Sequence, residues 1–318
     1  MAASLNIPDL EDRFLPSDNW RIKSFTREHR EIFYRTAFID TAKMNNPKGI
    51  VFCLPGLSEF GEKYIETTRH FNAEGFNVVV IDWAYQGLST RFKDNPHKRH
   101  SDGYDADILD LFHLITQEIK SDLPHYMLAH SMGGHIGLRF LSQYRDIFTT
   151  ASFSAPMIGI KSIRHLLPLH ACLAPWIKRK SEYYVPGGHD WRAIDRNDMV
   201  SDIFSHDSVR KKVHNAWCEG NLSLQIGSPT LQWIDASMRS IKILQSKETL
   251  NKINIPVYVT LAGKEQLVDN KASRKAIQQI KKCKVIEIEN SKHEILMETD
   301  EVRDIFLNET LALFNALN

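Results

Sequence analysis

One short motif combines a hydroxyl group with the small neighbours that a reactive serine needs. Residues 129–134 read Ala-His-Ser-Met-Gly-Gly, close to the pattern G-x-S-x-G with Ala129 in the first small position. A nucleophile on a sharp strand-to-helix turn sits in strained backbone, and the residues two before and two after it must be small. Ala129 and Gly133 meet that need. The motif predicts Ser131 as a nucleophile, and the alternative interpretation is a serine that caps a helix.

A serine that attacks a carbonyl group needs backbone amides that stabilise the oxyanion. The amide of Met132 can supply one, because it stands at the N-terminus of the predicted helix. The second is expected from the loop that follows Leu54, where Leu57 is our candidate. Taken alone, Pro55 and Gly56 in that loop indicate only a turn.

The serine also needs a base, and the base needs an acid that orients it. His293 is the candidate base, because it follows the last predicted strand and precedes the C-terminal helix. The other histidines, including His130 and His135, are interpreted as surface or core residues. His97 and His100 lie in a basic loop, RFKDNPHKRH, which we expect to be solvated.

Two carboxylates follow the predicted strand at 255–261 and compete for the role of the acid. Glu265 is closer to the strand end, where an orienting acid belongs. Asp269 stands where the next helix begins, so a capping role is expected for it. We favour Glu265 and keep Asp269 as the alternative.

These candidates fall at the ends of predicted strands. Apolar, β-branched runs predict strands at 49–54, 76–82, 125–129, 149–154, 255–261 and 284–289, after two antiparallel strands at 20–28 and 31–40. Apolar spacing near 3.6 residues predicts helices at 61–73, 104–119, 132–143, 270–282 and 300–317. This alternation indicates an α/β fold with a mostly parallel sheet covered on both faces.

The alternation of strands and helices stops between Pro156 and about Leu250. That stretch reads as helices and loops interrupted by proline and glycine. A structureless loop of this length is unusual inside a compact domain, so an inserted subdomain is the better interpretation. We therefore predict a core of residues 1–155 and 251–318 and a helical insertion of residues 156–250.

Composition excludes several functional classes. The 40 Lys and Arg balance 39 Asp and Glu, which gives no electrostatic reason to expect nucleic acid. No apolar stretch approaches the roughly 20 residues that cross a bilayer, and the N-terminus lacks the pattern of a secretory signal, so the cytoplasm is the expected compartment. Four widely spaced cysteines are interpreted as buried thiols in a reducing compartment. Without a metal or nucleotide motif, we expect no cofactor.

Several segments between about Phe33 and Phe314 together carry a family resemblance: LPGLSEFGEKY (54–64), VVVIDWAYQGLS (78–89), LAHSMGGH (128–135), SAPMIGI (154–160), GSPTLQWI (227–234), LAGKEQLVDN (261–270) and SKHEILME (291–298). They resemble the lysophospholipases of the monoacylglycerol-lipase-like group of α/β hydrolases, in particular the bacterial lysophospholipase branch.

The resemblance implies an α/β-hydrolase fold, with a mostly parallel eight-stranded sheet and an inserted helical cap. It places the nucleophile, acid, base and two oxyanion amides on Ser131, Glu265, His293, Leu57 and Met132. Many relatives have Asp at the acid position and His-Gly where this chain has Pro55 and Gly56. Many also have Arg and Gly where Ala84 and Tyr85 stand.

The implied cap contains an apolar face that is broken by Pro168. Its members are Ile160, Ile163, Leu166, Leu167, Leu173, Trp176 and Ile177. Such a face could wall an acyl tunnel or rest on a membrane surface, and it could equally pack the cap onto the sheet.

We therefore expect a serine carboxylic-ester hydrolase that forms an acyl-enzyme and acts on single-acyl lipids, a lysophospholipase first of all. A monoacylglycerol lipase or a general carboxylesterase is the alternative within enzymes. A catalytically silent ligand-binding member of the fold is the alternative from a different class. The expected partner is a small lipid ester, with a peripheral membrane contact through the cap.

Overall fold

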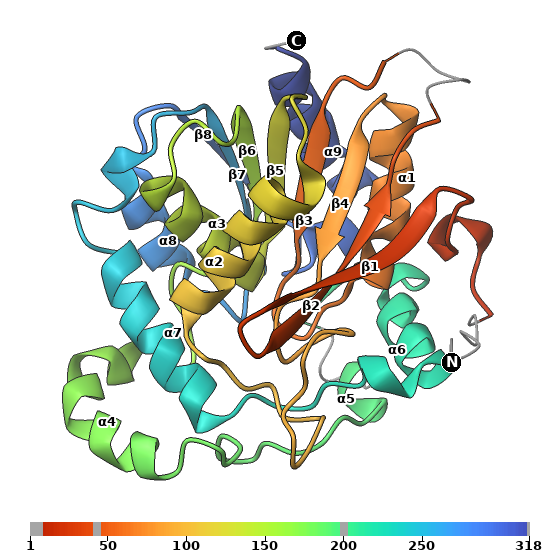
Figure 1. Ribbon diagram of the computed structural model, residues 1–318. Coiled ribbons are helices and arrows are strands. Elements are labelled where there is room, and N and C mark those ends of the chain that lie inside the picture. Colours follow the sequence, from red (N-terminus) through yellow and green to blue (C-terminus); the bar gives the residue numbers. More distant parts are fainter. Residues whose placement is uncertain (1–8, 41–45, 198–202, 317–318) are drawn as a thin grey trace.

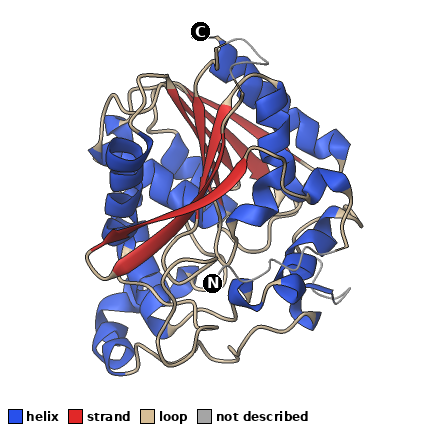
Figure 2. Ribbon diagram, turned by 45° about the vertical axis from the view of Figure 1, so that its right-hand side comes forward, coloured by secondary structure: helices blue, strands red, loops and turns tan. Residues whose placement is uncertain are grey.

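A computed structural model describes residues 9–40, 46–197 and 203–316 (Figure 1). Within these residues eight strands form one sheet in the order β1-β2-β4-β3-β5-β6-β7-β8. Figure 2 shows this sheet as a twisted layer between helices. The strands are β1 (Trp20–Arg27), β2 (Arg30–Ala37), β3 (Ile50–Leu54), β4 (Asn77–Ile81), β5 (His125–His130), β6 (Thr150–Ser154), β7 (Val257–Ala262) and β8 (Cys283–Ile288).

The pairing is antiparallel at one edge of the sheet and parallel elsewhere. β1 and β2 form an antiparallel hairpin in which Trp20 lies opposite Ala37, and β2 also pairs antiparallel with β4. All other neighbours are parallel. Parallel strands covered on both faces are apolar along their length, and every residue of β3, β4 and β6 is buried. The predicted fold class is confirmed.

Helices cover both faces of the sheet (Figures 1 and 2). On one face, α1 (Ile65–Ala73) and α9 (Asp300–Asn315) share a core in which the rings of Phe71 and Phe76 both contact Phe314. The core of the other face contains residues of α2 (Tyr104–His113), α3 (Ser131–Gln143) and α8 (Asn270–Ile277).

The connection from β6 to β7 contains α4 (His170–Arg179), α5 (Ile194–Asn197), α6 (Arg210–Gly220) and α7 (Leu231–Leu244). Figure 1 shows α4 and α5 beyond the lower end of the sheet, with α4 and α7 on one side and α5 and α6 on the other. This helical content agrees with an inserted cap. Its exact limits, 156 and 250, stay a prediction.

All eight strands overlap the predicted ranges. The helix predicted at 270–282 is shorter, because α8 ends at Ile277 and the chain turns there, with the Ile280 amide donating to the Ile277 carbonyl oxygen at 2.9 Å. The helix predicted at 300–317 ends at Asn315, and residue 317 lies outside the described residues.

Two expectations about side-chain exposure are wrong. The loop RFKDNPHKRH is not wholly solvated, because Arg99 is only 1 % exposed and its guanidinium bonds to Gln86. Of the four cysteines, Cys53 and Cys218 are buried, whereas Cys172 on α4 is exposed.

Candidate active site

The turn between β5 and α3 carries Ser131 at the carboxyl end of a central strand. Its φ of +49° lies in the left-handed region that L residues rarely adopt. A Cβ atom at Gly133 would lie 2.1 Å from the carbonyl oxygen of Leu54, so only glycine fits there. Ala129 pairs with Leu54 on one side and Phe153 on the other. Close approach of neighbouring strands explains why the residues around Ser131 are small.

Three side chains from different strand ends meet at this turn. His293 Nε2 lies 2.9 Å from Ser131 Oγ, and His293 Nδ1 lies 2.7 Å from Glu265 Oε2. Because an ionised carboxylate can only accept, Nδ1 carries the ring proton and Nε2 is free to accept the serine proton. All three side chains are buried. The arrangement can generate a serine nucleophile.

The Glu265 carboxylate is held for this task by the loop after β7. Its Oε1 accepts hydrogen bonds from the amides of Leu267 at 2.8 Å and Val268 at 3.2 Å. Burial alone would raise the pKa of Glu265, but His293 and the two amides lower it below its usual value. Glu265 is therefore ionised at neutral pH.

The other candidate acid, Asp269, has a different task in the structure. Its side chain accepts hydrogen bonds from the amides of Lys271 and Ala272 and caps the N-terminus of α8. The structure therefore brings Glu265, and not Asp269, to His293.

The two candidate oxyanion amides come from two different segments, the loop after β3 and the start of α3. Leu57 belongs to the loop after β3 and lines the same cavity as Ser131. Met132 is the second residue of α3, and its side chain is fully buried with Sδ 3.4 Å from Arg99 Nη2. The role of both amides in stabilising an oxyanion stays a prediction.

The two histidines beside Ser131 are core residues. His130 Nδ1 lies 3.1 Å from the Ser154 carbonyl oxygen, and burial lowers the pKa of His130 to about 4. His135 lies between the Met157 carbonyl oxygen and Ser240 Oγ, and burial lowers its pKa to about 3. Both rings are neutral at pH 7.

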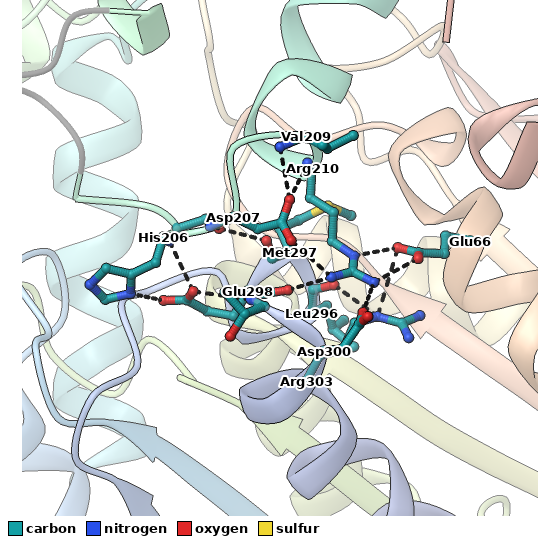
Figure 3. A network of polar contacts seen from close by, with 12 residues as sticks. Glu66, His206, Asp207, Val209, Arg210, Leu296, Met297, Glu298, Asp300 and Arg303 are labelled. Carbon is teal, nitrogen blue, oxygen red and sulfur yellow. Dashed lines mark hydrogen bonds and ion pairs between the residues drawn. The ribbon is translucent and has the colours of Figure 1, made fainter. Parts of the chain in front are cut away.

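The loop that carries His293 is anchored by Glu298, whose contact with His206 is visible in Figure 3. Glu298 is fully buried, and its Oε1 accepts a hydrogen bond from the Lys292 amide at 2.8 Å. The same carboxylate accepts from the His206 amide at 2.9 Å and lies 2.8 Å from His206 Nδ1. The residue before His293 is thereby tied to the segment between β6 and β7.

A second anchor in Figure 3 is Arg210, the first residue of α6. Its guanidinium donates to both oxygens of Glu66 on α1, at 2.7 and 2.8 Å, and to the Glu298 carbonyl oxygen at 2.8 Å. It also bonds to Asp300 at the start of α9. Arg210 therefore joins α6 to two helices of the sheet layer.

A cavity of about 730 Å³ is lined by Ser131 and His293. Its apolar wall comes largely from the segment leading into α4, from α4 itself and from α7, and includes Ile160, Ile163, Leu166, Leu173, Trp176, Ile177, Leu231, Trp233, Ile234 and Met238. Leu167 was predicted on the same apolar face, but its side chain is not among those that the structure describes. Polar lining residues around α5 and α6 include Arg192, Asp195, Arg196 and His214. The cavity thus has apolar and polar walls that come from different helices.

A buried network of charged side chains lies beside the polar wall and was not predicted from the sequence. Lys63 Nζ lies 2.6 Å from Glu59 and 2.7 Å from Glu294, which also pairs with Arg196 at 3.0 Å. Burial would raise the pKa of Glu59, but mainly Lys63 lowers it to about 2. The four-residue spacing of Glu59 and Lys63 was the only local sequence signal for this network. Glu294 comes from the opposite end of the chain.

Residues 45–300 match the family described as serine aminopeptidase, S33. The chain belongs to this family. The family segment contains β3, β5 and β7, the three strands that precede Leu57, Ser131 and Glu265, and it also contains His293.

Two curated relatives of this S33 family member are named lysophospholipase L2 or probable lysophospholipase L2. The chain is 26% identical over 296 residues to lysophospholipase L2 of Escherichia coli strain K12, covering 88% of this chain and 84% of the relative. It is 28% identical over 259 residues to a probable lysophospholipase L2 of Haemophilus influenzae, covering 80% of each.

Solved structures show the same fold. A soluble variant of monoglyceride lipase from Saccharomyces cerevisiae superposes with a TM-score of 0.72 at 17% identity, covering 93% of this chain and 96% of that one. A thermostable carboxyl esterase from Bacillus coagulans also gives 0.72, at 18% identity and with 94% and 99% covered. The findings confirm the predicted α/β-hydrolase fold, the family resemblance and the prediction of a carboxylic-ester hydrolase.

Two structural features are absent from the described residues. No helix there is long and apolar enough to span a membrane. The same part of the chain has no group of three or more His, Cys, Asp and Glu side chains that could hold a metal ion.

Proposed function

We propose that this enzyme hydrolyses the acyl ester of single-chain lipids, with lysophospholipids as the preferred substrates. The observation that carries the proposal is the contact of Ser131 with His293 inside a cavity whose wall is largely apolar. The sequence likeness to two lysophospholipases supports the choice of substrate class.

In the proposed mechanism, His293 Nε2 takes the proton of Ser131 as Oγ attacks the ester carbonyl carbon. The amides of Leu57 and Met132 stabilise the oxyanion that forms. Collapse of this intermediate expels the alcohol, which takes the proton from His293 and leaves an acyl-serine. His293 then removes a proton from water as the water attacks the acyl-serine, and it returns that proton to Ser131 Oγ when the bond to the acyl group breaks and the fatty acid leaves. Glu265 stabilises the imidazolium in both steps.

The apolar wall of the cavity supports an acyl chain as its ligand. Leu173 and Trp176 come from α4, and Trp233 and Met238 come from α7, so two helices enclose the proposed chain. Each methylene that leaves water contributes about 0.8 kcal/mol. A single long chain therefore gains binding energy that a short ester cannot gain.

The polar wall supports a charged head group. Arg192 and Arg196 both line the cavity, and guanidinium groups suit phosphate because they offer several donors in one plane. Arg196 is ordered by Glu294 at 3.0 Å and by the ring of Phe204 at 4.1 Å. A neutral monoacylglycerol has no group that needs these cations.

The cap also supports the proposed contact with a lipid surface. Trp176 on α4 lines the cavity and is 52 % exposed, and Leu169, just before α4, is 54 % exposed. Lys178 and Arg179 follow on the same helix and are exposed, which suits an anionic surface. The cytoplasmic location stays a prediction.

The proposal is tested by kcat/KM for lysophosphatidyl lipids, monoacylglycerols and p-nitrophenyl esters of matched acyl length, below their micelle concentrations, beside a diacyl lipid. We expect long single-chain esters to exceed short ones, lysophospholipids to exceed monoacylglycerols, and the gain to flatten once the chain outgrows the cavity.

Different outcomes identify different alternatives. Preference for acetyl or butyryl esters contradicts the lipid substrate and indicates a general esterase. Preference for monoacylglycerols over lysophospholipids of equal chain length indicates the monoacylglycerol lipase. Absence of turnover and of labelling by a fluorophosphonate indicates a silent ligand-binding protein.

A further inference from the structure

The loop that carries the Leu57 amide needs an external support to face the cavity. A backbone peptide stabilises an oxyanion only if its N–H is fixed toward the place where the charge forms. The loop is not part of a helix or strand, and Ser58 has a φ of +60°, in the left-handed region. Its own turn bond, from the Glu59 amide to the Gly56 carbonyl oxygen, is long at 3.3 Å.

The support comes from Gln86, a fully buried residue in the loop after β4. Its Nε2 donates to the carbonyl oxygens of Gly56 at 2.9 Å and Glu59 at 2.7 Å. Its Oε1 accepts from the Ser58 amide at 3.2 Å. These three backbone groups lie on both sides of Leu57 in the sequence, so one side chain fixes the peptides that flank it.

The orientation of the Gln86 amide is set by Arg99. The Arg99 Nε donates to Gln86 Oε1 at 2.8 Å, and a guanidinium can only donate. The carbonyl oxygens of Gly56 and Glu59 can only accept, so they require the amide nitrogen on their side. If the two ends of the amide were exchanged, its nitrogen would face the Arg99 donor and its oxygen would face the two carbonyl oxygens. Only one orientation of the amide is therefore compatible with the site.

The Glu59 carboxylate completes the support by accepting from the Gly56 amide at 2.5 Å and the Tyr64 hydroxyl at 2.7 Å. The amides of Gly56 and Ser58 are thus both occupied. Among the described residues, by contrast, no atom accepts a hydrogen bond from the Leu57 amide. The loop therefore leaves this one N–H available at the cavity.

We propose that Gln86 is a positioning residue for ester hydrolysis, which holds the Leu57 amide in the orientation that stabilises the oxyanion. This inference rests on the proposed function, because it assumes that Ser131 forms a tetrahedral oxyanion. Gln86 touches no reacting atom and acts through the backbone of residues 56–59.

The test compares wild-type enzyme with Gln86→Glu, which keeps the side-chain shape but removes both N–H donors, and with the uncharged Gln86→Met. We expect kcat for a p-nitrophenyl ester to fall about a hundredfold or more in both variants, as for the loss of an oxyanion donor, with KM nearly unchanged. The matched control is Gln278→Glu at an exposed position, which should keep wild-type kcat.

A second readout separates positioning from general damage. A trifluoromethyl ketone traps the tetrahedral state, because Ser131 Oγ adds to the ketone carbon, the proton passes to His293 and the ketone oxygen becomes the oxyanion. Its affinity should fall in proportion to kcat/KM in the Gln86 variants, while the pH profile of kcat/KM stays unchanged.

Three outcomes are decisive. Folded Gln86→Glu or Gln86→Met that retains more than about a third of wild-type kcat overturns the proposal, and so does a loss of kcat with unchanged ketone affinity. If Gln86→Glu does not fold, the same criteria apply to Gln86→Met. Wild-type protein that hydrolyses no ester at all contradicts the proposed function instead.

Discussion

Glu265 and Asp269 lie four residues apart after the same strand, but only the Glu265 carboxylate reaches the catalytic candidate His293, at 2.7 Å. We therefore expect Glu265→Gln to lower kcat roughly 10⁴-fold, because the amide no longer holds the imidazole in the required tautomer. Steady-state hydrolysis of a p-nitrophenyl ester measures this loss.

Asp269→Asn is the matched comparison for the acid. It should retain most activity and lower the free energy of unfolding by at most about 1 kcal/mol, because Asp269 caps α8 and an asparagine still accepts hydrogen bonds. A large activity loss confined to Asp269→Asn would reverse the assignment of the acid.

Buried neutral histidines predict that acid destabilises the fold. Burial lowers the pKa of His135 from 6.5 to about 3, so the unfolded chain binds one more proton than the folded chain between these values. The contribution of His135 to stability is therefore present above pH 6.5 and is lost as the pH falls toward 3. Urea unfolding at several pH values should show that the free energy of unfolding decreases as the pH falls. In His135→Asn this slope should be smaller, because up to one proton less is taken up on unfolding.

The control for this pH dependence is His165→Asn, since His165 is exposed. It should leave the slope of the unfolding free energy against pH as in the wild type. A wild-type slope in His135→Asn as well would mean that this buried ring does not contribute to the acid sensitivity.

Arg210 predicts a stability effect that extends over three helices. Its side chain is 2 % exposed and binds Glu66 on α1, so Arg210→Met leaves a buried carboxylate with less compensation and should cost about 3 kcal/mol in urea unfolding. Asp300 also pairs with Arg210 but is 73 % exposed, so Asp300→Asn should cost less than about 1 kcal/mol. Equal losses of unfolding free energy in the two variants would show that burial of the Arg210–Glu66 pair does not determine its contribution to stability.

The parts of the site that follow local rules could be predicted from the sequence. The turn around Ser131 requires small residues because neighbouring strands approach it closely. These residues lie within two positions of Ser131, so a local sequence motif reveals the requirement. His293 and Glu265 each follow a strand, and parallel strands bring their carboxyl ends to one edge of the sheet.

The parts that depend on long-range side-chain pairing could not be predicted. Lys63 contacts Glu294 across most of the chain length, and no local pattern specifies such a pair. Arg99 lies in a segment whose charges indicate a solvated loop, but its guanidinium is buried because Gln86 accepts a hydrogen bond from it. Burial of a charge depends on partners that only the folded chain supplies.

The central claim is that Ser131 is the nucleophile, and intact-mass spectrometry after reaction with a fluorophosphonate tests it most directly. The wild type should gain one covalent adduct that peptide mapping places on Ser131, and Ser131→Ala should gain none while its ester hydrolysis falls by about a millionfold. An adduct of equal yield in folded Ser131→Ala, or a tenth of the wild-type rate retained, would contradict the account.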